Sequence, residues 1–189
     1  MYKAIDLFAG IGGVRLGFER AFENTLKNVY SCEWDKPAQT TYNANFKDNY
    51  EIAGDITKVN EEDIPSFDIC CAGFPCVAFS LAGKRMGFQD LYKGQSRGIL
   101  FMDVVRICEH HKPKVIFCEN VKNLVDHDKG HTFTVIKEAF ETIGYKVFYK
   151  VLNSKDFGVP QNRPRIYYEF NACRQYDGRY FRRNAFVFV

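Results

Sequence analysis

The chain has 189 residues, a formal net charge of +3, 46% hydrophobic residues and 26% charged residues. This length and composition predict one globular domain with a sizeable core, and they argue against a disordered or fibrous protein. No apolar run approaches the length of a membrane span, and the N-terminus lacks a signal-peptide pattern, so we expect a cytoplasmic protein. The small positive charge permits nucleic-acid binding without arguing for it.

The cysteine pattern indicates reduced thiols rather than a disulfide framework. There are seven cysteines, an odd number, and no C-x-x-C pair. Five of them lie in apolar, element-like surroundings, which suits a reducing compartment: Cys32, Cys70, Cys71, Cys108 and Cys118. A zinc site built from His110, His111, Cys108 and Cys118 is a weak alternative, because adjacent histidines on one helix point in different directions. We therefore expect no metal.

Strand-like apolar runs alternate with helix-like segments along the chain. The strand pattern occurs at residues 4–9, 28–33, 50–53, 67–72, 114–119, 146–152 and 165–170. The helix pattern occurs at residues 14–22, 36–46, 99–111 and 132–143. This alternation predicts an α/β fold, a doubly wound and mostly parallel sheet with helices on both faces. Residues 80–97 are glycine-rich, charged and poorly periodic, which predicts a long loop of the kind that often serves function.

Four predicted strands end next to a chemically useful residue. These residues are Phe8 with the glycines that follow it, Glu33, Cys76 and Glu119. In open α/β sheets, functional groups gather outside the carboxyl ends of the strands, so four such endings indicate a site. Cysteine is strongly nucleophilic as its thiolate. Taken by itself, however, the stretch around Cys76 is explained more simply by a small apolar residue in a core.

The glycine turn after the first strand indicates a nucleoside ligand. Gly10-x-Gly12 begins a G-x-G-x-x-G fingerprint, but Arg15 replaces the third glycine, which disfavours a nicotinamide dinucleotide. Glu33 lies where an acid reaches ribose hydroxyls in nucleotide-binding sheets, and Trp34 offers a flat face for adenine. S-adenosylmethionine, a nucleoside without a pyrophosphate, fits these features. The alternative is that Glu33 and Trp34 are a solvated strand end and a core aromatic.

Four motifs, taken in order, resemble those of the DNA cytosine-5 methyltransferases. They are Asp6–Gly13 (DLFAGIGG), Gly73–Cys76 (GFPC), Glu119–Val121 (ENV) and Gln161–Arg165 (QNRPR). The resemblance covers about residues 4–168, with Glu33-Trp34 and Gly54-Asp55-Ile56 placed between the motifs. It implies a Rossmann-like methyltransferase domain over residues 1–168 and leaves an arginine- and aromatic-rich tail, residues 169–189, unassigned.

The resemblance implies transfer of a methyl group from S-adenosylmethionine to C5 of cytosine in DNA, with S-adenosylhomocysteine as product. Cys76 would add to C6 of the ring, forming a covalent intermediate. Glu119 matches the acid that acts near N3, and Arg163 and Arg165 match arginines used around O2, the nucleophile and the phosphates. If their stretch is extended, these two arginines face the same side.

The resemblance also assigns a cofactor site and a DNA-binding loop. Phe8 and Trp34 would flank adenine, Glu33 would bind ribose, and Asp55 would reach the adenine amino group. The remaining implied cofactor positions are Gly10, Gly12, Gly13, Ile56, Pro75 and Leu100. The loop at residues 80–97 resembles the segment that closes over an extruded cytosine. Its positions assigned to DNA are Ser80, Lys84, Arg85 and Arg97, and the basic ones among them, with Lys93, would attract phosphates.

The chain departs from the family pattern in four places, one of which is Leu91–Gln95, which looks like extra length inside the loop at residues 80–97. Val77 stands where the family usually has Gln, and Pro164 stands where an acid usually separates the two arginines. After Tyr168, neither the target-recognition region nor the last motif of the family is found. The resemblance implies double-stranded DNA as a partner, in a bacterial cytosol or nucleoid. Because the recognition region is missing, we also expect a second polypeptide that supplies it. The alternatives are an inactive truncated remnant that at most binds cofactor, and an RNA cytosine-5 methyltransferase.

Overall fold

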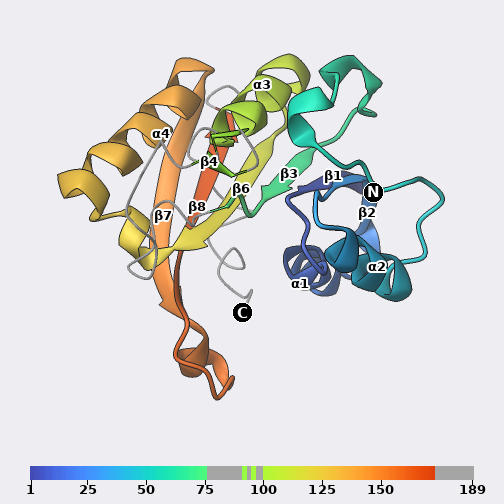
Figure 1. The fold of residues 1–189 in the computed structure, drawn as a ribbon, viewed down its shortest axis with the longest axis horizontal. Coiled ribbons are helices and arrows are strands. Elements are labelled where there is room, and N and C mark those ends of the chain that lie inside the picture. Colours follow the sequence, from blue (N-terminus) through green and yellow to red (C-terminus); the bar gives the residue numbers. More distant parts are fainter. Residues whose placement is uncertain (76–90, 93–94, 97–99, 173–189) are drawn as a thin grey trace.

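The computed structural model describes residues 1–75, 91–92, 95–96 and 100–172. A six-stranded sheet of order β2-β1-β3-β6-β8-β7 forms its centre (Figure 1). The strands are β1 (Tyr2–Leu7), β2 (Leu26–Cys32), β3 (Ile69–Ala72), β6 (Val115–Val121), β7 (Tyr145–Asn153) and β8 (Pro164–Ala172). The helices are α1 (Gly13–Phe22), α2 (Lys36–Asn45), α3 (Phe101–His111) and α4 (His131–Thr142).

The strand directions confirm the predicted doubly wound, mostly parallel sheet. The pairs β1–β2, β1–β3 and β3–β6 are parallel, whereas β8 is antiparallel to both of its neighbours, β6 and β7. Only β8 therefore runs against the common direction of the sheet. Consequently the four parallel strands at its centre and one side have their carboxyl ends at the same edge, which is where the sequence predicts the site.

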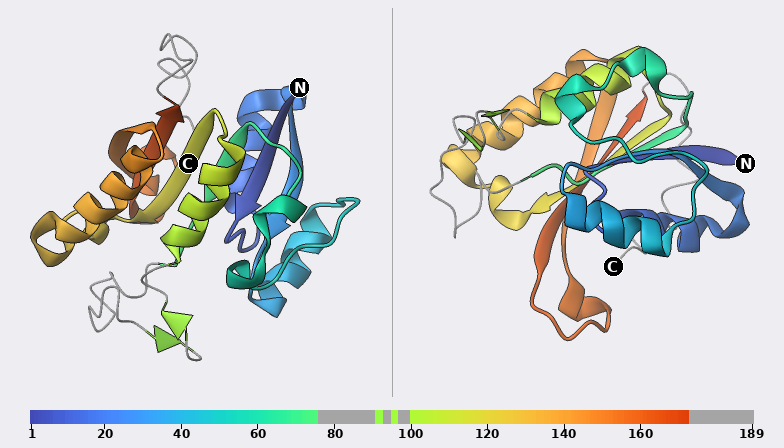
Figure 2. Two further views of the ribbon diagram at one scale, coloured as in Figure 1. Left: turned by 90° about the horizontal axis from the view of Figure 1, so that it is seen from above. Right: turned by 45° about the vertical axis from the view of Figure 1, so that its right-hand side comes forward.

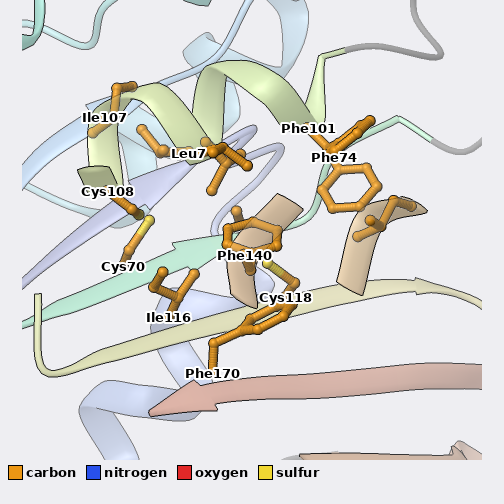
Figure 3. Close-up of a cluster of buried hydrophobic side chains, with 14 of the residues drawn as sticks. Leu7, Cys70, Phe74, Phe101, Ile107, Cys108, Ile116, Cys118, Phe140 and Phe170 are labelled. Carbon is orange, nitrogen blue, oxygen red and sulfur yellow. The ribbon is translucent and has the colours of Figure 1, made fainter. Parts of the chain in front are cut away.

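Helices cover both faces of the sheet, as predicted. Helices α1 and α2 lie on one face, and α3 and α4 lie on the other (Figures 1 and 2). The larger core fills the space between the sheet and α3 and α4, where Cys70, Cys118, Phe140 and Phe170 pack together (Figure 3). A smaller cluster under α1 includes Phe18. The five predicted core thiols are buried and free, as expected.

Two sequence predictions require correction. The strand predicted at residues 50–53 is wrong: only Ala53 forms an isolated parallel bridge, to Cys32. Tyr50 instead places its hydroxyl 3.0 Å from Ser31 Oγ. Within the loop predicted at residues 80–97, β4 (Leu91–Tyr92) and β5 (Gln95–Ser96) form a short antiparallel pair. The rest of that loop, including Lys93, lies outside the described residues.

Short 3-10 turns complete the connections in the described part of the chain. They span Glu23–Thr25, Ile56–Lys58, Glu61–Asp63, Lys122–Leu124, His127–Gly130 and Ser154–Phe157. No helix among the described residues is both long enough and apolar enough to cross a lipid bilayer.

Candidate active site at the carboxyl ends of the strands

The carboxyl ends of β1, β3 and β6 bring three of the sequence motifs together. The Gly73 amide, just past β3, donates to the Leu7 carbonyl at the end of β1 over 3.3 Å. A Cβ placed on Gly73 would lie 3.7 Å from Glu119 Oε2, so the chain leaving β3 passes directly beside Glu119. The half-buried Pro75 continues this path. Cys76, Ser80, Lys84, Arg85 and Arg97 lie outside the described residues, so their predicted roles stay predictions.

Asn120 fixes this approach to the predicted nucleophile. Its buried side-chain amide donates to the Phe74 carbonyl over 3.3 Å. The bond ties the segment two residues before Cys76 to the strand that carries Glu119. Asn120 had no predicted role of its own, although the residue lies inside the Glu119–Val121 motif. Its position directly after the candidate acid was the signal available.

The turn after β1 has a left-handed backbone at three of its residues and is open on one side. Phe8, Gly10 and Gly12 have φ angles of 56°, 55° and 90°. For Phe8, a non-glycine residue, this left-handed backbone costs about 1–2 kcal/mol, and such strain is typical of functional sites. The turn is closed by the Gly12 amide, which donates to the Ala9 carbonyl over 2.8 Å. Nothing lies within 4 Å of a Cβ placed on Gly10 or Gly13, so this side of the turn is open.

Glu33 is tied to the glycine turn by its own carboxylate. Glu33 Oε2 accepts from the Gly10 amide over 2.7 Å, and Oε1 accepts from the Asp35 amide over 2.7 Å. A carboxylate has about four acceptor positions, so two remain for ligand hydroxyls. Trp34, the next residue, keeps 41% of its surface exposed. An acid with unused acceptor positions and an accessible ring therefore stand beside the turn.

The segment around Asp55 lies along the end of β2, next to Glu33. The Glu33 amide donates to the Ala53 carbonyl over 2.8 Å, which places the following residues beside this strand end. Ile56 is buried in the main core, and Leu100 packs against that core where α3 begins. Asp55 Oδ1 accepts from the Thr57 amide and hydroxyl over 3.1 and 2.8 Å. Ile56 and Leu100 therefore meet the same core, and the residues after Ala53 lie beside the end of β2.

Glu119 and the two arginines form the charged part of the site. Arg165 Nε lies 2.7 Å from Glu119 Oε1, and both side chains are largely buried. Burial raises the pKa of Glu119, while Arg165 and Arg163 oppose this rise, and the net shift is upward. Both guanidinium groups thus act on the same carboxyl. Arg163 is held by its amide, which donates to Asn153 Oδ1 over 2.9 Å.

One cavity joins the turn to the charged group. It has a volume of about 740 Å³ and lies between α1, the glycine turn and strands β6 and β8. Its lining includes Phe8, Gly10, Gly13, Glu119, Arg163 and Tyr167. Five of these six residues were predicted site residues, drawn from both the cofactor side and the catalytic side. Glu33, Trp34 and Asp55 do not line this cavity, so it joins the glycine turn, not the whole predicted cofactor site, to Glu119 and Arg163.

The residues present fit S-adenosylmethionine. The nucleoside part needs an acid with spare acceptors, a flat apolar surface and a turn that admits close approach, and Glu33, Trp34 and Gly10 supply these. The described residues show no cluster of three or more metal-ligand side chains. His111, a member of the weak zinc alternative, instead places Nε2 2.8 Å from the Glu61 carbonyl oxygen, and Cys108 is buried in the core.

The family model for the C-5 cytosine-specific DNA methylases matches residues 2–172 of this chain. The chain belongs to this family, whose members use S-adenosylmethionine. Among curated relatives, the type II methyltransferase M.SsoII of Shigella sonnei is 54% identical over 88% of this chain and 41% of its own length. M.HhaI of Haemophilus parahaemolyticus is 53% identical over 87% of this chain and 47% of its own length.

Solved structures agree on the fold. The Dnmt2 methyltransferase of Schizosaccharomyces pombe superposes with a TM-score of 0.72 at 19% identity, covering 94% of this chain and 53% of that protein. The Entamoeba histolytica methyltransferase EhMeth gives a TM-score of 0.72 at 22% identity, covering 90% and 53%. The fold is therefore that of the methyltransferases. The chain spans about half the length of the curated relatives that it matches.

Proposed function

We propose that this chain is the catalytic core of a DNA cytosine-5 methyltransferase and that residues 1–168 form its cofactor-binding and catalytic domain. The observation that carries the proposal is the Glu119–Arg165 pair, in which Glu119 lies beside the chain segment that leads to Cys76 and lines the same cavity as the glycine turn. The acid, the segment that leads to the predicted nucleophile and the glycine turn support this proposal because all three lie at the carboxyl ends of neighbouring strands. The bacterial relatives favour a bacterial cytosol as the location.

The proposed chemistry begins at Cys76, because C5 of cytosine is a poor nucleophile until the ring is activated. The Cys76 thiolate adds to C6, and the electron pair of the C5–C6 bond becomes available at C5. C5 then takes the methyl group from the sulfonium of S-adenosylmethionine, which leaves as S-adenosylhomocysteine. Loss of the C5 proton to a base and expulsion of the thiolate complete the reaction and restore the aromatic ring.

Glu119 would stabilise the charge that this addition creates. Addition at C6 places negative charge toward N3 and O2, and a protonated acid at N3 lowers the barrier by donating a hydrogen bond. Burial favours the protonated form of Glu119 by raising its pKa. Arg165, in contact with the carboxyl, and Arg163, on the cavity wall, would bind O2 and the phosphates. Ser80, Lys84, Arg85 and Arg97 would contact DNA.

We further propose that a second polypeptide or segment supplies target recognition. The chain spans only 41–49% of three curated relatives. Sequence-specific methylation would then require both parts.

Labelled methyl transfer to mixed-sequence DNA tests the proposal. The chain is assayed alone and together with the carboxyl-terminal half of M.HhaI, the part that this chain does not match. We expect transfer in the complemented sample and its loss with Cys76→Ala, while Cys71→Ala, a substitution at a buried core thiol, serves as the matched control. Absence of transfer from every combination, with cofactor binding intact, would contradict methylation and favour a remnant. Transfer to structured RNA but not to DNA would identify RNA as the substrate in place of DNA.

A further inference from the structure

The segment between the glycine turn and Glu33, the acid that follows β2, contains a buried arginine that the proposed reaction does not use. Arg15 lies in the first turn of α1, at the position where the G-x-G-x-x-G fingerprint would have its third glycine. Only 8% of its surface is exposed. An arginine is rarely buried to this degree unless its donors are paired, so the surroundings of Arg15 must provide acceptors.

Arg15 links α1 to residues 42–48, a segment that is distant in sequence. Its Nη1 and Nη2 atoms lie 2.5 and 2.9 Å from the two carboxylate oxygens of Asp48, a bidentate ion pair. Nη1 also donates to the Tyr42 hydroxyl over 2.8 Å, and Nε donates to Glu19 Oε1 over 2.7 Å. The guanidinium carbon lies 4.1 Å from the centre of the Phe46 ring. The arrangement holds α1 against the end of α2 and the residues that follow it.

Phe46 links Arg15 to the glycine turn. A Cβ placed on Gly12 would lie 2.1 Å from Phe46 Cε2, so the ring rests directly against the backbone of Gly12. One face of the turn is therefore packed by Phe46. The same ring is held by Arg15 through a cation–π contact. The absence of a side chain at residue 12 is thus required both by its φ angle and by the ring.

Tyr42 links Arg15 to β2. Its hydroxyl lies 2.6 Å from Ser31 Oγ, and Ser31 precedes Glu33 by two residues. Glu33 in turn accepts from the Gly10 amide, which closes a continuous circuit of contacts from the turn through Arg15 and Tyr42 to β2 and back to the turn. The circuit consists of buried or half-buried groups, where hydrogen bonds between polar groups are strong and costly to break.

We propose that Arg15 is a positioning residue for the cofactor: with Tyr42, Phe46 and Asp48 it forms a clamp that fixes the distance between the glycine turn and Glu33. The clamp lies behind the turn and contacts no predicted ligand-binding side chain directly. It prepares the nucleoside cradle before ligand arrives, so less binding energy is lost in ordering it. This inference rests on the proposed function, because it assumes that the cradle binds S-adenosylmethionine.

The test compares cofactor affinity with stability in folded variants. Arg15→Gln removes the ion pair, Arg15→Lys keeps the charge without the bidentate geometry, and Phe140→Leu lowers stability from the opposite face of the sheet. Dissociation constants for S-adenosylmethionine are measured by calorimetry well below every melting midpoint. We expect Arg15→Gln to weaken binding at least tenfold, Arg15→Lys to lie between it and the unmodified chain, and Phe140→Leu to stay within twofold. Equal affinities in all folded variants would overturn the clamp.

Hydrogen exchange of the Gly10 amide, measured by NMR without cofactor, separates failure of the clamp from failure of the proposed function. Because Gly10 donates to Glu33 only while the cradle is held together, we expect its exchange in Arg15→Lys to be at least tenfold faster than in Phe140→Leu. Exchange rates that match in the two variants would overturn the clamp. If the unmodified chain binds no cofactor, the proposed function fails, while the exchange rates still decide whether Arg15 holds the turn.

Discussion

Arg165 and Glu119 form an ion pair with Nε and Oε1 2.7 Å apart, joining the end of β6 to the start of the antiparallel strand β8. Two opposing influences therefore act on one carboxyl. Burial favours its protonated form, and the arginine favours its ionised form. The balance leaves the pKa of Glu119 above its ordinary value, as expected for an acid that donates a hydrogen bond to a base.

Replacing Arg165 should therefore move the titration of Glu119. Arg165→Met removes the nearest charge that lowers the pKa of Glu119, so the pKa should rise further while burial persists. The protonated form then survives to higher pH. NMR titration of a 13C-labelled carboxyl group should show the midpoint shifting upward, and Lys155→Met, an exposed change in the turn between β7 and β8, should leave it in place. A midpoint that falls or stays unchanged in Arg165→Met would refute this reading of the pair.

Asp6 should make the stability of the fold depend on pH. Burial raises the pKa of Asp6 to about 7, opposed by Arg15, and its Oδ2 has no hydrogen-bond partner. The folded state therefore holds a proton that the unfolded state releases near pH 4. Stability should fall as pH rises from about 4 to about 7, by on the order of 4 kcal/mol, and should then level off.

Asp6→Asn, which cannot ionise, should remove this contribution. Urea unfolding at pH 5 and pH 8 measures the free energy of unfolding in both proteins. The unmodified chain should lose more stability than the variant between the two pH values. Equal losses would show that Asp6 does not titrate in this range.

Gly12 should tolerate substitution far less well than Gly13. Gly12→Ala meets both a φ angle of 90° and the Phe46 ring, so we expect a loss of about 2–4 kcal/mol of stability. Gly13→Ala meets nothing within 4 Å and begins α1, so it should be neutral or stabilise by up to about 1 kcal/mol. Thermal melts compare the two. If Phe46→Ala does not restore part of the loss in Gly12→Ala, the contact with the ring is not its cause.

The carboxylate of Glu33 should contribute strongly to cofactor affinity. Glu33→Gln keeps the shape but loses the charge that now accepts from the Gly10 amide. Hydrogen bonds to charged groups contribute about 1.5–3 kcal/mol, so affinity for S-adenosylmethionine should fall by about 10- to 100-fold. Asp35→Asn, at the cap of α2, is the control, because its side chain accepts from Ala38 instead. Similar affinities for Glu33→Gln and Asp35→Asn would contradict the role of Glu33.

Much of this fold could be predicted because buried parallel strands appear as apolar runs, and their endings mark one edge. The direction of β8 could not, since the residues from Arg165 to Phe170 have the same pattern in either orientation. The strand predicted at residues 50–53 was wrong: Tyr50 and Ile52 are residue types that suit a strand, yet the Tyr50 hydroxyl joins a polar network instead. In the sequence, Arg15 is notable only because it replaces the third glycine of the fingerprint. Its partner Asp48 lies 33 residues away, and nothing local connects the two.

Covalent capture tests the central claim most directly. Duplex DNA containing 5-fluorocytosine cannot release its C5 substituent as a proton, so the addition product with the nucleophile should persist. With S-adenosylmethionine and the complementing carboxyl-terminal half of M.HhaI present, the account predicts an adduct whose mass and peptide map place the base on Cys76. The adduct should be absent in Cys76→Ala. An adduct on another residue, or one that survives Cys76→Ala, would contradict the account.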